Sequence, residues 1–399
     1  MSDSNAKKTK YFKRIIAIAA MLFSLFISLA FLQKYLCIPY SFDQNRAIMI
    51  HKEPKNSIDV LFIGSSATYS GFSSVYAYEK YGFTSFPYAI GGSTCTSWKP
   101  AVQDVLATQN PKLIVVDVFG GGYDLDLIET RNNQFYTIMS HMPLSNDKVY
   151  TAEYLSKNVN GTSEFSLLFP IAKYHNSIPR NLKSLGDTWT AFHSSPSPLK
   201  GVEVITRTRK LKNVEEISFS EDAVPLDKKT ESIIRDFIDY CKENELNLLF
   251  VKYPTVLTEN DPDELLVNLK ANRILEIANE SGFATLNMQK QFHDIGLIET
   301  QDYYNHGHTN TRGQKKITAF LGDYICNNLH IESSKLDGQT ADDWNRSILY
   351  YNAYCELCEE LISQGKSVSL GDCPELIADL EQIINGESVK TIADKYHEE

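Results

Sequence analysis

Short apolar runs alternate with amphipathic stretches along much of the chain. Near-continuous apolar strands that alternate with helices are typical of a parallel sheet covered on both faces. The pattern therefore predicts an α/β domain over residues 58–330. The apolar runs lie at 58–63, 85–90, 112–118, 247–252 and, less strongly, 284–288. Apolar positions at helical spacing lie over about 98–109, 228–244, 262–281 and 312–329.

One long stretch, residues 123–225, breaks this alternation. It is rich in aromatic residues, Asn, Ser and Pro, and its length of about 100 residues exceeds that of an ordinary crossover. We interpret it as an insertion over the carboxyl edge of the sheet. Such an insertion either builds a substrate cleft or serves as a structural cap, and the sequence leaves both open.

The last part of the chain, residues 331–399, has no strand pattern. It holds 15 acidic and 5 basic side chains, which accounts for most of the chain's net charge of −11. We expect an acidic helical appendage, either a docking surface or a solvated cover. Its first helix should open with a capping box at Thr340 and end at Gly365, and Asp372 should cap the second.

The N-terminal region predicts a membrane anchor. Residues 15–32 form a run of 18 residues without a charge, long enough to span a bilayer and longer than the usual apolar part of a cleaved signal. No Ala-x-Ala-like cleavage site follows, so we expect an uncleaved anchor over 15–36, with a cleaved signal as the alternative. Residues 33–57 read as a linker that leads into the first strand.

Charge around this run predicts the orientation of the chain. Residues 1–14 carry five basic side chains against Asp3 alone. Basic residues before an apolar span keep the N-terminus in the cytoplasm. We therefore expect a single-pass protein of the cell membrane, with a basic cytoplasmic tail at 1–14 and the α/β domain outside the cytoplasm.

Composition narrows the classes of partner. The chain has no basic stripe with interleaved aromatic residues, which argues against nucleic-acid binding. Seven cysteines in 399 residues are too few for a disulfide scaffold. We expect no cofactor. We also expect no metal, because His306 and His308 supply two ligands at most and no third is evident.

Two motifs far apart in the chain suggest a shared chemistry. The first runs from Asp59 to Ser66, where an apolar strand enters a Gly-Ser-Ser turn. The second holds His308 in a polar turn that precedes a helix. In an open α/β sheet such turns gather at the carboxyl ends of the strands, and a serine nucleophile needs a base. The pair predicts acyl-ester chemistry, with Ser66 as nucleophile and His308 as base.

These motifs resemble blocks of the SGNH (GDSL-type) hydrolases over roughly residues 58–329. Gly64-Ser65-Ser66 resembles the first block, with Ser65 where many members have Asp. Ala89-Ile90-Gly91 resembles the second block, and Asn305-His306-Gly307-His308 resembles the final Asp-x-x-His. The resemblance implies a flavodoxin-like three-layer α/β/α sandwich in which Ser66 attacks, His308 is the base and the Gly91 N–H helps to hold the oxyanion.

The resemblance is closest to a membrane-anchored subgroup that includes the D-alanine transfer protein of teichoic acids and the alginate O-acetylation proteins. It implies a cell-envelope glycan as substrate and a membrane-bound O-acyltransferase as partner.

The chain departs from the family pattern in two places. Asn305 stands where the family has the triad Asp, and loss of that carboxylate can cost roughly 10⁴ in rate. Asn305 could still orient His308 by accepting from its N–H, and nearby Asp302 is the alternative. The usual third block is also replaced by a glycine run at 119–122.

Backbone N–H groups are the candidate donors to an oxyanion or substrate. In the third block, such a donor would come from the glycine run, with Gly120 as candidate beside Gly91 and Gly92. Ser65 is interpreted as a turn or capping residue at the same site.

The sequence thus favours an extracytoplasmic serine esterase or O-acyltransferase that acts on acyl groups, such as acetyl, of a cell-envelope polysaccharide. Hydrolysis and transfer share the covalent intermediate, so both stay open. The alternative is a non-catalytic envelope protein that keeps the fold to bind carbohydrate or to organise a membrane complex.

Overall fold

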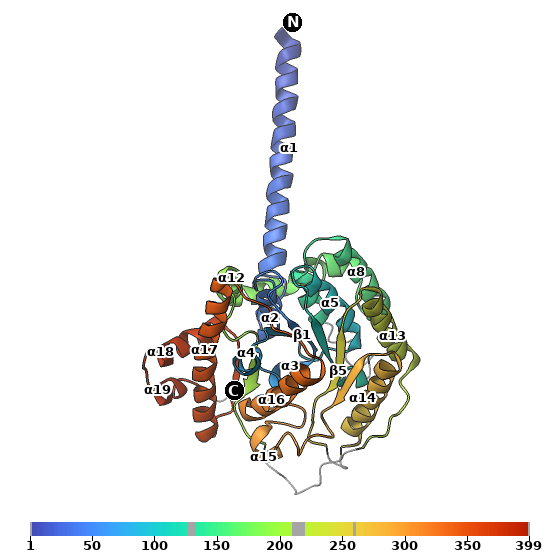
Figure 1. Ribbon diagram of the computed structural model, residues 1–399. Helices are drawn as coiled ribbons and strands as arrows, with labels where there is room; N and C mark the ends of the chain where they lie inside the picture. The colour runs from blue at the N-terminus through green and yellow to red at the C-terminus, as the bar shows by residue number, and fades with distance from the viewer. Residues whose placement is uncertain (1, 124, 126–132, 210–219, 258–260, 398–399) are drawn as a thin grey trace.

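Five parallel strands form the centre of the fold in the computed structural model, which describes residues 2–123, 125, 133–209, 220–257 and 261–397 (Figure 1). Their order is β2-β1-β3-β5-β6, and every neighbouring pair is parallel. The predicted parallel α/β sheet is confirmed. The chain passes from β1 to β2 on one side and then crosses back to β3 on the other side of β1, which creates a switch point between β1 and β3 at their carboxyl ends. The strands are β1 (Val60–Gly64), β2 (Ser85–Ala89), β3 (Leu113–Asp117), β5 (Leu248–Lys252) and β6 (Ala284–Asn287).

Helices cover both faces of the sheet, and the strand residues alternate between two cores. Leu61 and Ile63 of β1 belong to one core, whereas Val60 and Phe62 belong to the other, as the two-residue period of a strand requires. The first core holds α5 (Trp98–Leu106), α13 (Lys228–Glu243) and α14 (Pro262–Glu280). The second holds α3 (Ser66–Gly71), α4 (Ser74–Tyr81) and α16 (Thr311–Asn328).

Helix α1 (Ser2–Tyr35) projects from the domain as a single long rod (Figure 1). Its segment Lys10–Tyr35 is long and apolar enough to cross a membrane, by length and composition. The expectation of a linker at 33–57 is wrong, because α1 continues to Tyr35 and α2 (Phe42–Ile50) follows. The Ser41 side chain caps α2 by accepting from the Gln44 N–H. Residues 44–50 are buried all round, so α2 lacks the amphipathic stripe by which a surface helix is recognised.

Short helices make up most of the described part of the insertion, and they lie at the base of α1 (Figure 1). They enclose a small core of their own, which also contains Cys37 and Ile38 from the segment after α1. Strand β4 (Glu203–Ile205) lies in the later part of the insertion and pairs antiparallel with β7 (Ser369–Gly371) near the C-terminus. The helices are α7 (Asn133–His141), α8 (Asn146–Asn158), α9 (Glu164–Leu168), α10 (Ile171–Tyr174), α11 (Ile178–Asn181) and α12 (Leu185–His193).

The C-terminal region is mainly helical, as expected, but it also contains the strand β7, which the sequence did not predict. Helix α17 (Gly338–Ser363) is capped by Asp337, whose side chain accepts from the Thr340 N–H, so Thr340 is not the cap. Cys373 occupies the cap position of α18 (Pro374–Ile384), and α19 (Val389–Ala393) follows. Asp372 is buried and accepts instead from the Ser197 hydroxyl and the Gly201 N–H. Its carboxylate serves a tertiary contact with the insertion, which a local capping rule does not reveal.

Short 3₁₀ and α turns complete the chain. They are η1 (Cys95–Ser97), η2 (Phe119–Gly122), η3 (His175–Ser177), η4 (Leu182–Ser184) and α15 (Glu299–Asp302).

Substituting Gly64 with alanine is expected to destabilise the fold by about 3 kcal/mol. Its φ is +156°, and a Cβ would overlap the Thr68 hydroxyl and the Asp117 side chain. Urea unfolding of the detergent-solubilised chain measures the change. Gly186→Ala is the matched control, because a Cβ there meets nothing within 4 Å. Equal stability of the two variants would contradict the close packing at the end of β1.

Candidate active site

The structure brings Ser66 and His308 together at the carboxyl end of β1. Ser66 is the first residue of α3, and His308 lies in the turn between α15 and α16. The Ser66 hydroxyl lies 2.6 Å from His308 Nε2, although 242 residues separate the two. Since helix α3 begins at Ser66, the Ser66 N–H is one of the helix's first amides and has no acceptor within the helix.

Asn305 holds the imidazole of His308 from its other side. Its Oδ1 accepts from the backbone N–H groups of Gly307 and His308, each at 3.0 Å, and lies 2.8 Å from His308 Nδ1. Two backbone donors identify this atom as the amide oxygen, so Nδ1 must carry the proton. Nε2 is then unprotonated and can accept from the Ser66 hydroxyl. The arrangement fixes the tautomer that a general base requires.

The environment of His308 favours its neutral form. The ring stacks on Tyr304, with centroids 5.4 Å apart. Burial lowers the pKa of His308 to about 4. Asn305 offers no negative charge to oppose this effect, as an aspartate would. At neutral pH the imidazole is therefore a neutral acceptor aimed at Ser66.

Asp302, the alternative partner of His308, has other contacts. Its Oδ2 accepts from the Ile298 N–H at 2.7 Å and from Lys316 Nζ at 2.6 Å. The carboxylate is buried in this pairing. Asn305, rather than Asp302, meets the imidazole, so the notion that Asp302 substitutes for the missing carboxylate does not match the geometry.

Ser65 lines the same cavity as Ser66, but its hydroxyl bonds to Asp117 rather than to His308. Its hydroxyl donates to Asp117 Oδ2 at 3.1 Å, and the Thr68 hydroxyl lies 3.3 Å from the same oxygen. Asp117 Oδ1 accepts from the Phe119 N–H at 3.0 Å. Burial raises the pKa of Asp117, and these hydrogen bonds oppose the rise. Asp117 thus joins the ends of β1 and β3 behind Ser66.

The glycines expected to hold an oxyanion differ in their surroundings. Gly91 and Gly92 line the cavity beside Ser66. The Gly91 N–H already donates to Asp43 Oδ1 at 3.1 Å. Gly120 packs against the Ser93 carbonyl and the Ser65 side chain, where a Cβ would collide with the former. Gly120 therefore supports the turn and is not among the lining residues of the cavity.

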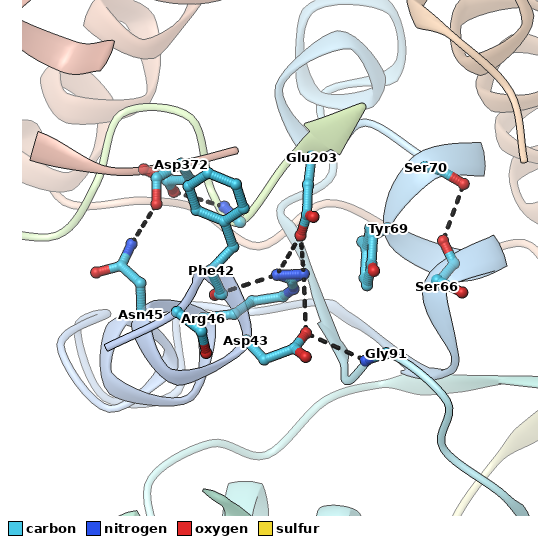
Figure 2. A network of polar contacts seen from close by, with 12 residues as sticks. Phe42, Asp43, Asn45, Arg46, Ser66, Tyr69, Ser70, Gly91, Glu203 and Asp372 are labelled. Atoms are coloured by element: carbon cyan, nitrogen blue, oxygen red, sulfur yellow. Dashed lines mark hydrogen bonds and ion pairs between the residues drawn. The ribbon is translucent and has the colours of Figure 1, made fainter. Parts of the chain in front are cut away.

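Asp43 belongs to a charged network that sequence reasoning missed (Figure 2). Arg46 contacts Asp43 at 3.4 Å and Glu203 at 2.8 Å, and its guanidinium lies 4.0 Å from the centroid of the Tyr69 ring. Burial raises the pKa of Glu203 to about 7, against the effect of Arg46. Asp43 and Arg46 fall in the stretch read as a linker, and Glu203 is 157 residues from Arg46, so no local signal connected them.

A cavity of about 990 Å³ surrounds the Ser66 hydroxyl. Its described lining includes the carboxylates of Asp43 and Glu264 but no lysine or arginine. The insertion supplies part of the wall, which favours its interpretation as a builder of the cleft. The lining residues from the insertion are Tyr123, Gln134, Thr137 and Tyr174.

No protein-family model matches the chain, and no curated protein sequence matches it. Several solved structures are similar in fold. A catalytic mutant of Axe2, an acetylxylan esterase from Geobacillus stearothermophilus, gives a TM-score of 0.36 at 12% identity, covering 71% of this chain and 100% of that one.

Two further structures give similar values. A family two carbohydrate esterase from Clostridium thermocellum gives a TM-score of 0.34 at 10% identity, covering 70% of this chain and 66% of that one. A protein described as lipolytic and of the G-D-S-L family, from Desulfitobacterium hafniense DCB-2, gives 0.34 at 9% identity, covering 66% and 97%.

Proposed function

We propose that this protein is a serine acyl-ester hydrolase or O-acyltransferase, which removes or transfers a small acyl group such as acetyl on a cell-envelope glycan. Ser66 attacks the acyl carbonyl while His308 Nε2 takes its proton. The acyl group stays on Ser66 Oγ, and His308 returns the proton to the leaving oxygen. Water or a glycan hydroxyl then attacks the acyl-enzyme.

One observation carries this proposal above the non-catalytic alternative. The hydrogen bonds run from Ser66 to His308 and on to Asn305, with the proton on Nδ1. The large loss known for an Asp-to-Asn change in such a triad is attributed to the wrong tautomer. Here the amide oxygen faces the imidazole, so Asn305 supplies the orientation of an aspartate without its charge.

Helix α1 would anchor the chain in the cell membrane, with residues 1–14 in the cytoplasm and the domain outside. The cavity is larger than an acetyl group needs, which leaves room for part of a glycan. The resemblance of the motifs adds a membrane-bound O-acyltransferase as the supplier of acyl groups.

The test is acylation of the full-length chain in detergent micelles. The protein is treated with 4-nitrophenyl acetate or a fluorophosphonate, and the modified residue is identified by mass spectrometry. Modification of Ser66 is the expected result. Added oligosaccharide then separates transfer, which yields an acetylated sugar, from hydrolysis, which yields acetate. A folded chain that neither reagent modifies at Ser66 would contradict the proposal.

Asn305→Asp is expected to speed acylation of Ser66 by about 10- to 100-fold. This gain is smaller than the roughly 10⁴-fold loss in rate that follows when the histidine also has the wrong tautomer. A carboxylate at this position stabilises the imidazolium and raises the pKa of His308. Rates of fluorophosphonate labelling between pH 4 and 8 measure both effects. The midpoint of the pH profile should move upward in the variant. A slower variant with an unmoved midpoint would refute the assigned role of Asn305.

Asp43→Asn is expected to speed acylation about tenfold, because a carboxylate beside Gly91 repels the negative charge that develops on the carbonyl oxygen. Arg46 neutralises part of this charge in the native chain. The asparagine can keep the hydrogen bond from Gly91. Single-turnover rates with 4-nitrophenyl acetate measure the change. A slower Asp43→Asn variant would contradict the repulsion assigned between the Asp43 carboxylate and the developing oxyanion.

A further inference from the structure

The insertion is fixed to the point where α1 enters the domain. Gln33 donates to the Leu168 carbonyl of α9 at 3.3 Å. Asn181 of α11 donates to the Leu36 carbonyl at 2.9 Å. The Tyr35 ring lies 5.3 Å from that of Trp189 in α12. Three insertion helices thus contact the end of α1 or the residue after it, and the structure holds them at the level where the apolar stretch of α1 ends.

These same helices expose large apolar side chains, which we call the membrane-facing surface. It consists of Phe165 (66% exposed), Phe169 (48%), Leu182 (54%) and Trp189 (48%). Exposed apolar side chains gathered in one region mark an interaction site. Phe, Trp and Leu are side chains typical of the region where proteins meet the lipid headgroups.

Charge around this surface suits a bilayer with anionic lipids. Arg180 and Lys183 are exposed beside Leu182, and Lys34 lies at the end of α1. Basic side chains next to a membrane span are attracted to anionic headgroups. Over 164–193 the opposing acids are Glu164 and Asp187. The bilayer is favoured over a protein partner because α1 ends at this surface, so a membrane that contains α1 must pass here.

The cavity begins at this same level. Ile38, Pro39 and Ser41, which follow α1 within a few residues, line it, and Tyr174 of α10 completes that side. The route to Ser66 is therefore bordered by chain that lies against the end of the anchor.

We propose that helices α9 to α12 rest on the membrane through the membrane-facing surface and hold the cavity open at the level of the lipid headgroups. This deepens the proposed function and rests on its membrane anchor. It makes the substrate one that is presented at the bilayer surface. A soluble polymer far from the membrane could not reach a cavity so placed.

The chain offers a fluorescence test. It has three tryptophans, of which Trp98 and Trp344 are buried and Trp189 is exposed. The full-length chain is placed in nanodiscs of phosphatidylcholine and phosphatidylglycerol, with or without bromine on the acyl chains. In the Trp189→Phe background, Phe165→Trp is the reporter. Ile298→Trp is the matched control, because residue 298 is 43% exposed and precedes α15, which lies at the far end of the domain from α1 (Figure 1).

Brominated lipid should quench the Phe165→Trp emission and leave that of Ile298→Trp unchanged. Adding Arg180→Glu and Lys183→Glu should lessen the quenching. Equal emission of the Phe165→Trp reporter in both lipids would overturn the proposal. Two controls distinguish failure of this proposal from failure of the proposed function. Release of the chain from vesicles by alkaline carbonate would show that α1 does not anchor it. Fluorophosphonate labelling in detergent tests the chemistry of Ser66 without a membrane.

Discussion

Ser66→Ala is expected to abolish covalent labelling by fluorophosphonate and formation of an acetyl-enzyme. No other described residue combines a hydroxyl at a helix start with an imidazole nitrogen 2.6 Å away. Turnover of 4-nitrophenyl acetate should fall by about 10⁶-fold, the loss seen when a triad nucleophile is removed. Intact mass and initial rates of the full-length chain measure the two quantities.

Ser65→Ala is the matched control for this loss. Ser65 is the neighbouring serine, and its hydroxyl donates to Asp117 rather than to His308. Its removal should slow labelling by loosening the turn, yet the label should still reach Ser66. Labelling that persists in Ser66→Ala and vanishes in Ser65→Ala would reverse the roles assigned to the two residues.

His308→Ala should lower turnover by about 10⁶-fold, nearly as much as loss of the nucleophile, because residues that act as one catalytic unit cannot work without one another. Without the imidazole, the Ser66 proton has no acceptor. His306→Ala is the control, since His306 Nδ1 lies 3.2 Å from the Val256 carbonyl, whereas the imidazole beside the Ser66 hydroxyl is that of His308. A small effect is expected there, and initial rates with 4-nitrophenyl acetate compare the two variants.

The same base predicts the pH dependence of acylation. His308 acts when it is unprotonated, so the rate should rise with pH through the pKa of about 4 and then level off. An unburied histidine would give a midpoint near 6.5. Burial disfavours the charged ring, which moves the midpoint downward. Labelling rates from pH 3.5 to 8 test this, and a midpoint at or above 6.5 would show that the imidazole is not desolvated as the structure has it.

Much of the sheet could be predicted from the sequence because its strands are buried on both faces. Val60 to Ile63 are apolar without interruption, and each pairs with strands on both sides. Helices such as α13 expose one face and so carry a clear period. Helix α2 could not be predicted from the sequence, because its residues, polar ones included, are buried by parts of the chain far away in sequence.

The same difference between local patterns and tertiary packing applies to the candidate site. Ser66, Asn305 and His308 belong to short motifs, so their spacing alone suggested a pair of facing groups. Asp43 could not be found in this way, because its contact with the Gly91 N–H depends on where α2 packs. The closeness of Asp302 to His308 in sequence predicts it as an alternative partner of the imidazole, whereas its carboxylate is paired with Lys316 in the structure. Local patterns identify reacting groups, and only tertiary packing identifies the charges around them.

The pairing of β4 with β7 bears on how this chain completes its fold during synthesis. Trp344 of α17 belongs to the main core, and Asn45 of α2 donates to the Asp372 carbonyl at 2.6 Å across 327 residues. The residues that follow α1 therefore find their partners only after nearly all of the chain has emerged. Contacts so distant in sequence are slow to form and leave apolar surface open meanwhile. We expect truncation after α16 to yield a chain that is retained by folding chaperones rather than a smaller folded domain.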